Sequence, residues 1–82
     1  MQKMEKIIIT RLADLQMGDR LMALDGKPYR KPLVVQDPLS PIRYGSPVRG
    51  VRFIPPEGSD IEWVFYPSQM DGHEMTVERR RR

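Results

Sequence analysis

In the stretch IEWVFY, residues 61–66, large apolar side chains occupy every second position, beginning with Ile61. On an extended chain, successive side chains point to opposite faces. One face then holds Ile61, Trp63 and Phe65, and the other holds Glu62, Val64 and Tyr66. This alternation favours a β-strand with one buried face, and it predicts that Trp63 lies in the core.

Five further short runs carry β-branched or alternating apolar residues: KIIIT (6–10), RLMAL (20–24), PLVVQ (32–36), VRGVRF (48–53) and EMTVER (74–79). Three stretches between the runs are rich in turn-forming residues: DGKP (25–28), PPEGSD (55–60) and PSQMDG (67–72). The pattern predicts about six short antiparallel strands joined by hairpin connections. Their expected core consists of Ile8 or its neighbours, Leu21, Val35, Phe53, Trp63, Phe65, Met75 and Val77.

Helix signals are sparse. Only TRLADLQMG (10–18) spaces its leucines as a helix does, between Thr10 and Gly18, so we expect at most one short helical turn near 11–17. With 82 residues and no cysteine, the chain must be stabilised by packing or oligomerisation. We therefore expect a mainly β domain over residues 1–78, a five- to six-stranded antiparallel barrel of the SH3-like or OB-like kind.

Charge is strongly segregated along the chain. Residues 27–52 hold six basic side chains and one acidic one, whereas residues 57–78 hold six acidic side chains and no Lys or Arg. The chain ends in four arginines, 79–82, which we expect to form a disordered basic tail. A structural explanation of the pattern is that strand 48–53 pairs with strand 61–66, so that Arg49 or Arg52 meets Glu62 across the sheet.

The segment LQMGDRLMALDG, residues 15–26, resembles the opening of small β-barrel domains, where a short turn ending in Gly-Asp leads into a strand and an Asp-Gly hairpin. With its Arg, Asp and Pro bias and the ending MTVERR, the sequence is similar to small uncharacterised proteins of actinobacterial phages. This resemblance implies a phage accessory protein without a fixed activity. No apolar run approaches the roughly 20 residues of a membrane span, and no signal-peptide core follows the N-terminal lysines. We expect a cytoplasmic protein, in the host cytoplasm if phage-encoded, that does not bind membranes.

Residues suited to catalysis are few. The chain has one histidine, His73, and no serine lies in a nucleophile motif. Asp71, His73 and Glu74 are donors within one turn, too few for a convergent metal site. The sequence predicts no enzyme, no cofactor, no metal site and no small-molecule substrate.

The basic third interleaves cations with tyrosines, as proteins that bind single-stranded nucleic acid do. The residues concerned are Lys27, Tyr29, Arg30, Lys31, Arg43, Tyr44, Arg49 and Arg52. A nucleic-acid-binding barrel that uses them together with the arginine tail is our alternative hypothesis. The neighbouring acidic segment argues against it, because it repels phosphate within a Debye length of about 8–10 Å.

The segment DPLSPIRYGSP, residues 37–47, contains three prolines and is expected to form a stiff loop between two strands. A stiff loop presents side chains at low entropic cost, and Tyr and Arg are enriched at protein interfaces. Leu39 and Ile42 either face a partner or fold back onto the barrel. Our leading hypothesis is a non-catalytic module that binds a protein partner or a second copy of itself. Its predicted partner-binding residues are Ile42, Arg43, Tyr44, Arg49 and Arg52.

Overall fold

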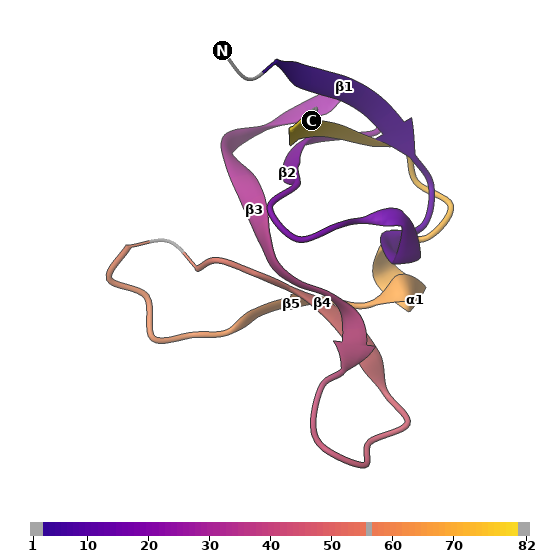
Figure 1. The fold of residues 1–82 in the computed structure, drawn as a ribbon, viewed down its shortest axis with the longest axis vertical. Coiled ribbons are helices and arrows are strands. Elements are labelled where there is room, and N and C mark those ends of the chain that lie inside the picture. Colours follow the sequence, from indigo (N-terminus) through magenta and orange to yellow (C-terminus); the bar gives the residue numbers. More distant parts are fainter. Residues whose placement is uncertain (1–2, 56, 81–82) are drawn as a thin grey trace.

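The structure, a computed structural model, describes residues 3–55 and 57–80. Its strands are β1 (Met4–Ile9), β2 (Arg20–Leu24), β3 (Lys27–Pro41), β4 (Arg49–Phe53), β5 (Trp63–Phe65) and β6 (Met75–Arg80). Two single helical turns complete it, the 3-10 turn η1 (Leu12–Asp14) and the α-helix α1 (Pro67–Met70). The prediction of a mainly β protein with six antiparallel strands and a helical turn within 11–17 is confirmed, but α1 is a second turn where at most one was expected (Figure 1).

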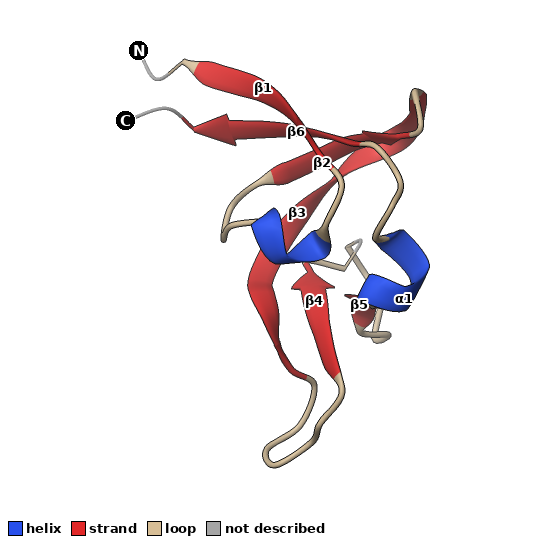
Figure 2. Cartoon of the chain, turned by 90° about the vertical axis from the view of Figure 1, so that its right-hand side faces the viewer, coloured by secondary structure: helices blue, strands red, loops and turns tan. Residues whose placement is uncertain are grey.

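The strands form one antiparallel sheet in the order β1-β6-β2-β3-β4-β5. β3 is the long strand that joins its two halves: residues up to Val34 pair with β2, and residues from Val35 onward pair with β4. A straight strand of 15 residues would be about 50 Å long, more than the 39 Å longest dimension of the molecule. β3 therefore bends, and register shifts after Val35 and Asp37 mark where it does so (Figure 2).

Four prolines lie within β3: Pro28, Pro32, Pro38 and Pro41. Proline is tolerated in a strand where its missing N–H needs no partner. Each half of β3 pairs with one neighbouring strand, so one side of its backbone is left without a ladder. The expected loop over 37–47 is therefore wrong in its first part: residues 37–41 extend β3, and the loop itself spans residues 42–48.

The core is a single cluster to which nearly every element contributes. Its members are Leu12, Leu15, Leu21, Val35, Val51, Phe53, Met70, Met75 and Val77. The two helical turns cover it from one side, and they are tied together where Leu12 N–H donates to Asp71 Oδ1 at 2.9 Å and Gly72 N–H donates to Thr10 O at 2.9 Å. The predicted inward positions Leu21, Val35, Phe53, Met75 and Val77 are confirmed.

Two details of the expected core differ, and the choice left open between Ile8 and its neighbours is decided. β5 is three residues long, and Ile61 lies before it with 73% of its surface exposed. Trp63 and Phe65 are half-buried and pack against the core from its edge. Ile8 is exposed, whereas its neighbours Ile7 and Ile9 pack on the core, because the buried face of β1 holds the odd-numbered positions.

The connection 67–72 is not a hairpin, because β6 lies between β1 and β2 and is not adjacent to β5. The chain crosses there through α1, where Gln69 Oε1 accepts a hydrogen bond from Tyr66 N–H at 3.1 Å.

The expected disorder from residue 79 is also wrong for Arg79 and Arg80, which belong to β6. Arg79 is held by Asp19: its Nε and Nη2 donate to the two carboxylate oxygens at 3.0 and 2.8 Å. The remaining two arginines of the expected tail, 81 and 82, lie outside the described residues.

Candidate functional site

The β3–β4 hairpin extends away from the body of the molecule, as Figures 1 and 2 show from two sides. Its loop is internally hydrogen bonded. Ile42 N–H donates to Val48 O at 3.0 Å, Ser46 N–H donates to Arg43 O at 3.0 Å, and Val48 N–H donates to Ser46 Oγ at 3.1 Å. Gly45 supplies the left-handed conformation of the turn with φ of 78°. The loop therefore holds a defined shape.

The side chains at this end of the hairpin are exposed. Tyr44 is fully exposed and makes no packing contact with the core, and Val48 is 47% exposed. Arg43 and Arg49 are also exposed, while Ile42 is half-buried. We call the surface formed by Ile42, Arg43, Tyr44, Val48 and Arg49 the tip. A fully exposed aromatic side chain in a segment with two exposed arginines is an arrangement that the core does not require.

Four of the five predicted partner-binding residues meet at the tip: Ile42, Arg43, Tyr44 and Arg49. The fifth, Arg52, has a structural role at the base of the hairpin. Its guanidinium donates a short hydrogen bond to Ile42 O, and its Nε lies 3.9 Å from Glu62 Oε1. Leu39 packs against the core, so it folds back on the body and does not face outward.

The expected pairing of the basic and acidic strands is confirmed. β4 pairs with β5, with Arg52 opposite Val64, and Arg52 meets Glu62. Glu62 is 75% exposed, so this ion pair contributes only a few tenths of a kcal/mol. The local pairing accounts for part of the charge pattern and leaves Arg43 and Arg49 outside it.

The residues of the nucleic-acid hypothesis fall into two groups at opposite ends of β3. Lys27, Tyr29, Arg30 and Lys31 lie at its start, beside β2. Arg43, Tyr44, Arg49 and Arg52 lie at the far hairpin and its base (Figure 1). Tyr29 packs against the core, and burial raises the pKa of its hydroxyl, with the charge of Asp25 adding to this. The structure therefore does not bring the eight residues together in one groove.

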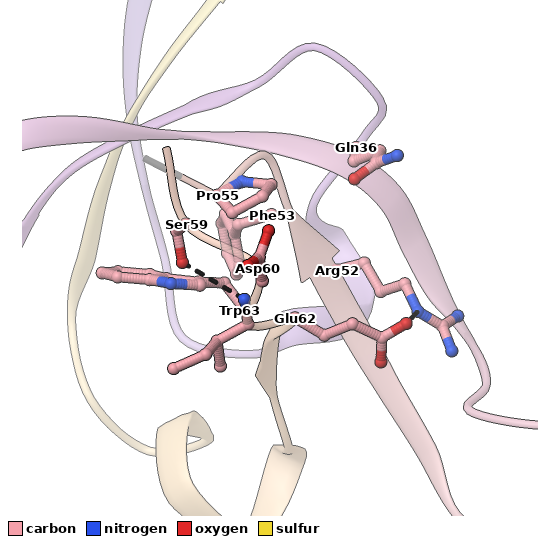
Figure 3. A pocket seen from close by; sticks show the side chains of 9 residues that line it. Gln36, Arg52, Phe53, Pro55, Ser59, Asp60, Glu62 and Trp63 are labelled. Carbon is pink, nitrogen blue, oxygen red and sulfur yellow. Dashed lines mark hydrogen bonds and ion pairs between the residues drawn. The ribbon is translucent and has the colours of Figure 1, made fainter. Parts of the chain in front are cut away.

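An open pocket of about 300 Å³ lies between β4, β5 and the loop that joins them (Figure 3). Pro55, Ile61 and Trp63 supply its apolar surface, to which the buried Phe53 adds little, and Arg52, Asp60 and Glu62 supply its charges. Ser59 Oγ accepts a hydrogen bond from Ile61 N–H at 3.3 Å, which shapes the loop at the rim. The sequence does not predict this pocket, because its pattern places Asp60 in a turn and Trp63 in the core.

A second polar cluster lies at the β2–β3 turn. Asp25 Oδ2 is 2.6 Å from Nδ1 of His73, and Asp25 Oδ1 accepts from Glu74 N–H at 2.8 Å. Asp71 instead accepts from Leu12 N–H. The side chains of this turn that could bind a metal thus contact different partners. Within 3–55 and 57–80, no three His, Asp or Glu side chains gather as metal ligands.

The Asp25 contacts predict an acid-dependent loss of stability. The hydrogen bond from His73, followed by that from Glu74 N–H, lowers the pKa of Asp25 below its ordinary value of 3.8. A lowered carboxyl pKa stabilises the fold at pH values above the unfolded pKa, and this contribution is lost as pH falls through the folded pKa. In urea unfolding, Asp25→Asn should therefore be slightly less stable than the parent at pH 6, with the difference shrinking below about pH 4. Asn tolerates the positive φ of 50° at this position, so the turn itself is kept. A constant difference between pH 6 and pH 3 would contradict this assignment.

Comparison with protein-family models, with curated proteins and with solved structures finds no match to this chain. In the described part of the chain, no helix is long and apolar enough to span a bilayer.

Proposed function

We propose that the protein is a non-catalytic interaction module whose tip binds a protein partner or a second copy of the chain. The observation that carries the proposal is Tyr44, fully exposed at the end of a hydrogen-bonded hairpin that extends from the body. A binding surface whose shape is already set loses little entropy when it is covered. Tyr and Arg together dominate the energetics of many protein interfaces.

The two kinds of side chain at the tip have separable roles. Arg43 and Arg49 would steer an acidic partner toward the tip and orient it, and Tyr44 and Ile42 would supply most of the affinity once water is excluded. Arg52, which binds Ile42 O and Glu62, would fix the direction of the hairpin and not contact the partner.

Two tip substitutions test the proposal by binding kinetics with a partner captured from the source cells, or with the protein itself. Tyr44→Ala should raise the dissociation rate about 30-fold, which corresponds to about 2 kcal/mol. Arg43→Glu should slow association and reduce its salt dependence. Met17→Ala is the matched control, because Met17 is 71% exposed in the loop that precedes β2. If both tip variants bind with the kinetics of the control, the tip is only a connection between strands.

The alternative, binding of single-stranded nucleic acid, is supported at the tip by one observation: the exposed Tyr44 follows Arg43 and precedes Arg49 in the sequence, and both arginines are exposed. The capture should therefore be repeated with nuclease and over a range of salt. Nucleic-acid binding would be lost with nuclease, would fall steeply with salt and would weaken with both Arg43→Ala and Arg49→Ala. If nucleic-acid binding requires only the arginines after residue 80, it belongs to the end of the chain and not to the tip.

We also propose that the sheet is a small barrel of the SH3-like or OB-like kind and that the protein is a cytoplasmic phage accessory protein. The bent β3, shared by the two halves of the sheet, supports the first idea. Closure would require contacts between β1 and β5, which are the two ends of the strand order. Nuclear Overhauser effects between these two strands in solution would test it.

A further inference from the structure

The pocket on β4 and β5 has the features of an acceptor for two side chains, one aromatic and one cationic. Trp63 and Pro55 give it apolar surface, and Asp60 and Glu62 also line it (Figure 3). With Arg52 as its one cation, the lining has a net charge of −1, and the exposed Glu57 lies in the same loop. Its volume of about 300 Å³ is at the lower limit for small-molecule sites, and it suits one or two side chains.

The tip has the complementary chemistry. It offers one fully exposed ring, Tyr44, and the preceding residue in the sequence, Arg43, is also exposed. Residues 38–56 contain three arginines and no acidic residue, whereas residues 57–62 contain three acidic residues and no basic one. An aromatic ring prefers another aromatic or a proline surface, and a guanidinium prefers a carboxylate that can accept two hydrogen bonds.

From this complementarity we infer that the pocket accepts the tip of a second copy of the chain, with Tyr44 against Trp63 and Pro55 and Arg43 paired with Asp60. The inference rests on the proposed function of the tip. In Figure 1 the hairpin and the β4–β5 loop leave the body in different directions, so the end of the hairpin does not lie at the pocket of its own chain. Arg52 lines the pocket, donates to Ile42 O in the tip and lies 3.9 Å from Glu62 Oε1, so it contacts both the donor and the acceptor surface.

A contact between a tip and a pocket joins two different surfaces. Two copies that dock reciprocally close into a dimer, and copies that dock head to tail continue until they close into a ring or form a filament. Blocking the tip of one chain and the pocket of another should leave one functional contact between the two. Such a mixture should stop at a dimer.

Two variants test this by sedimentation velocity at high protein concentration. Tyr44→Ala removes the tip anchor, and Asp60→Lys reverses the charge at the pocket edge; both side chains are exposed. Glu74→Lys makes the same charge change at an exposed position outside the pocket and serves as the control. We expect the parent and Glu74→Lys to form dimers or larger species, each of the other two variants to remain monomeric, and their equimolar mixture to form a dimer.

Three results would overturn the inference. The first is a monomeric parent, the second is Asp60→Lys associating as the parent does, and the third is a mixture that stays monomeric. None of them refutes the proposed function by itself, because capture of a different partner that depends on Tyr44 would leave the tip as the binding surface. Loss of Tyr44 dependence in every assay would refute both.

Discussion

Phe53→Ala should lower the free energy of unfolding by about 3–5 kcal/mol, a large part of the total for a domain of this size. Phe53 is 1% exposed in β4, and its ring lies 4.9 Å from that of Phe65, centroid to centroid, in a tilted arrangement. Its removal would leave a cavity at the point where β3, β4 and β5 share the core. Urea unfolding followed by the fluorescence of Trp63 gives the value directly, because Trp63 is the only tryptophan of the chain and pairs with Phe53 across the sheet.

Ile61→Ala is the matched control for Phe53→Ala. Ile61 belongs to the same region of the chain but is 73% exposed, so its truncation should change stability by no more than about 0.5 kcal/mol. If the two substitutions cost the same, the core does not lie between β3, β4 and β5 as described.

Asp19→Asn should cost about 3 kcal/mol, because it breaks a buried ion pair while leaving one partner charged. Asp19 is 2% exposed and accepts three hydrogen bonds, from Gln16 N–H at 2.8 Å and from Nε and Nη2 of Arg79. Asparagine keeps the size of the side chain but presents an NH₂ group to donors. The hydrogen bond to Asp19 raises the pKa of Arg79 above the already strongly basic range of arginine, so its cationic form persists at neutral and mildly basic pH and the deficit should not vary between pH 6 and 9.

Asp14→Asn provides the comparison for a surface ion pair. Asp14 lies 3.7 Å from Arg11, and both side chains are well exposed, so the loss should stay within about 0.5 kcal/mol. Equal losses for Asp14→Asn and Asp19→Asn in thermal or urea unfolding would show that the Asp19–Arg79 pair does not secure the end of β6.

The sequence predicted the strands well because their alternation is a local property. Every expected run overlaps an observed strand, and Met75 and Val77 are buried as the alternation requires. The failures arise where a residue's role depends on a distant partner. Arg79 looked like the start of a charged tail, but Asp19, 60 positions earlier, holds it in β6. Pro38 and Pro41 signalled a loop, yet a strand that pairs on one side only accommodates them.

The candidate site was predictable in the same uneven way. The exposure of Arg43 and Tyr44 followed from a stiff segment between two apolar runs, and the structure places both at the tip. The structural role of Arg52 was predicted only in part. Its contact with Glu62 follows from strand pairing, but its hydrogen bond to Ile42 O depends on the three-dimensional course of the hairpin. The pocket has no local signature, since its lining comes from three separate segments.

The claim that the tip is the binding surface can be tested most directly by site-specific photo-crosslinking. The sequence contains no cysteine, so a benzophenone maleimide can be attached to the single thiol of Pro47→Cys, beside Tyr44, or of Met17→Cys; both positions are exposed. The label at position 47 should give a crosslinked product, which excess unlabelled parent suppresses and excess Tyr44→Ala does not, and the label at position 17 should give none. A product mapped to residues 52–63 of a second copy would identify the pocket as the acceptor. Equal yields from the two positions, or a product at 17 alone, would contradict the assignment of the tip.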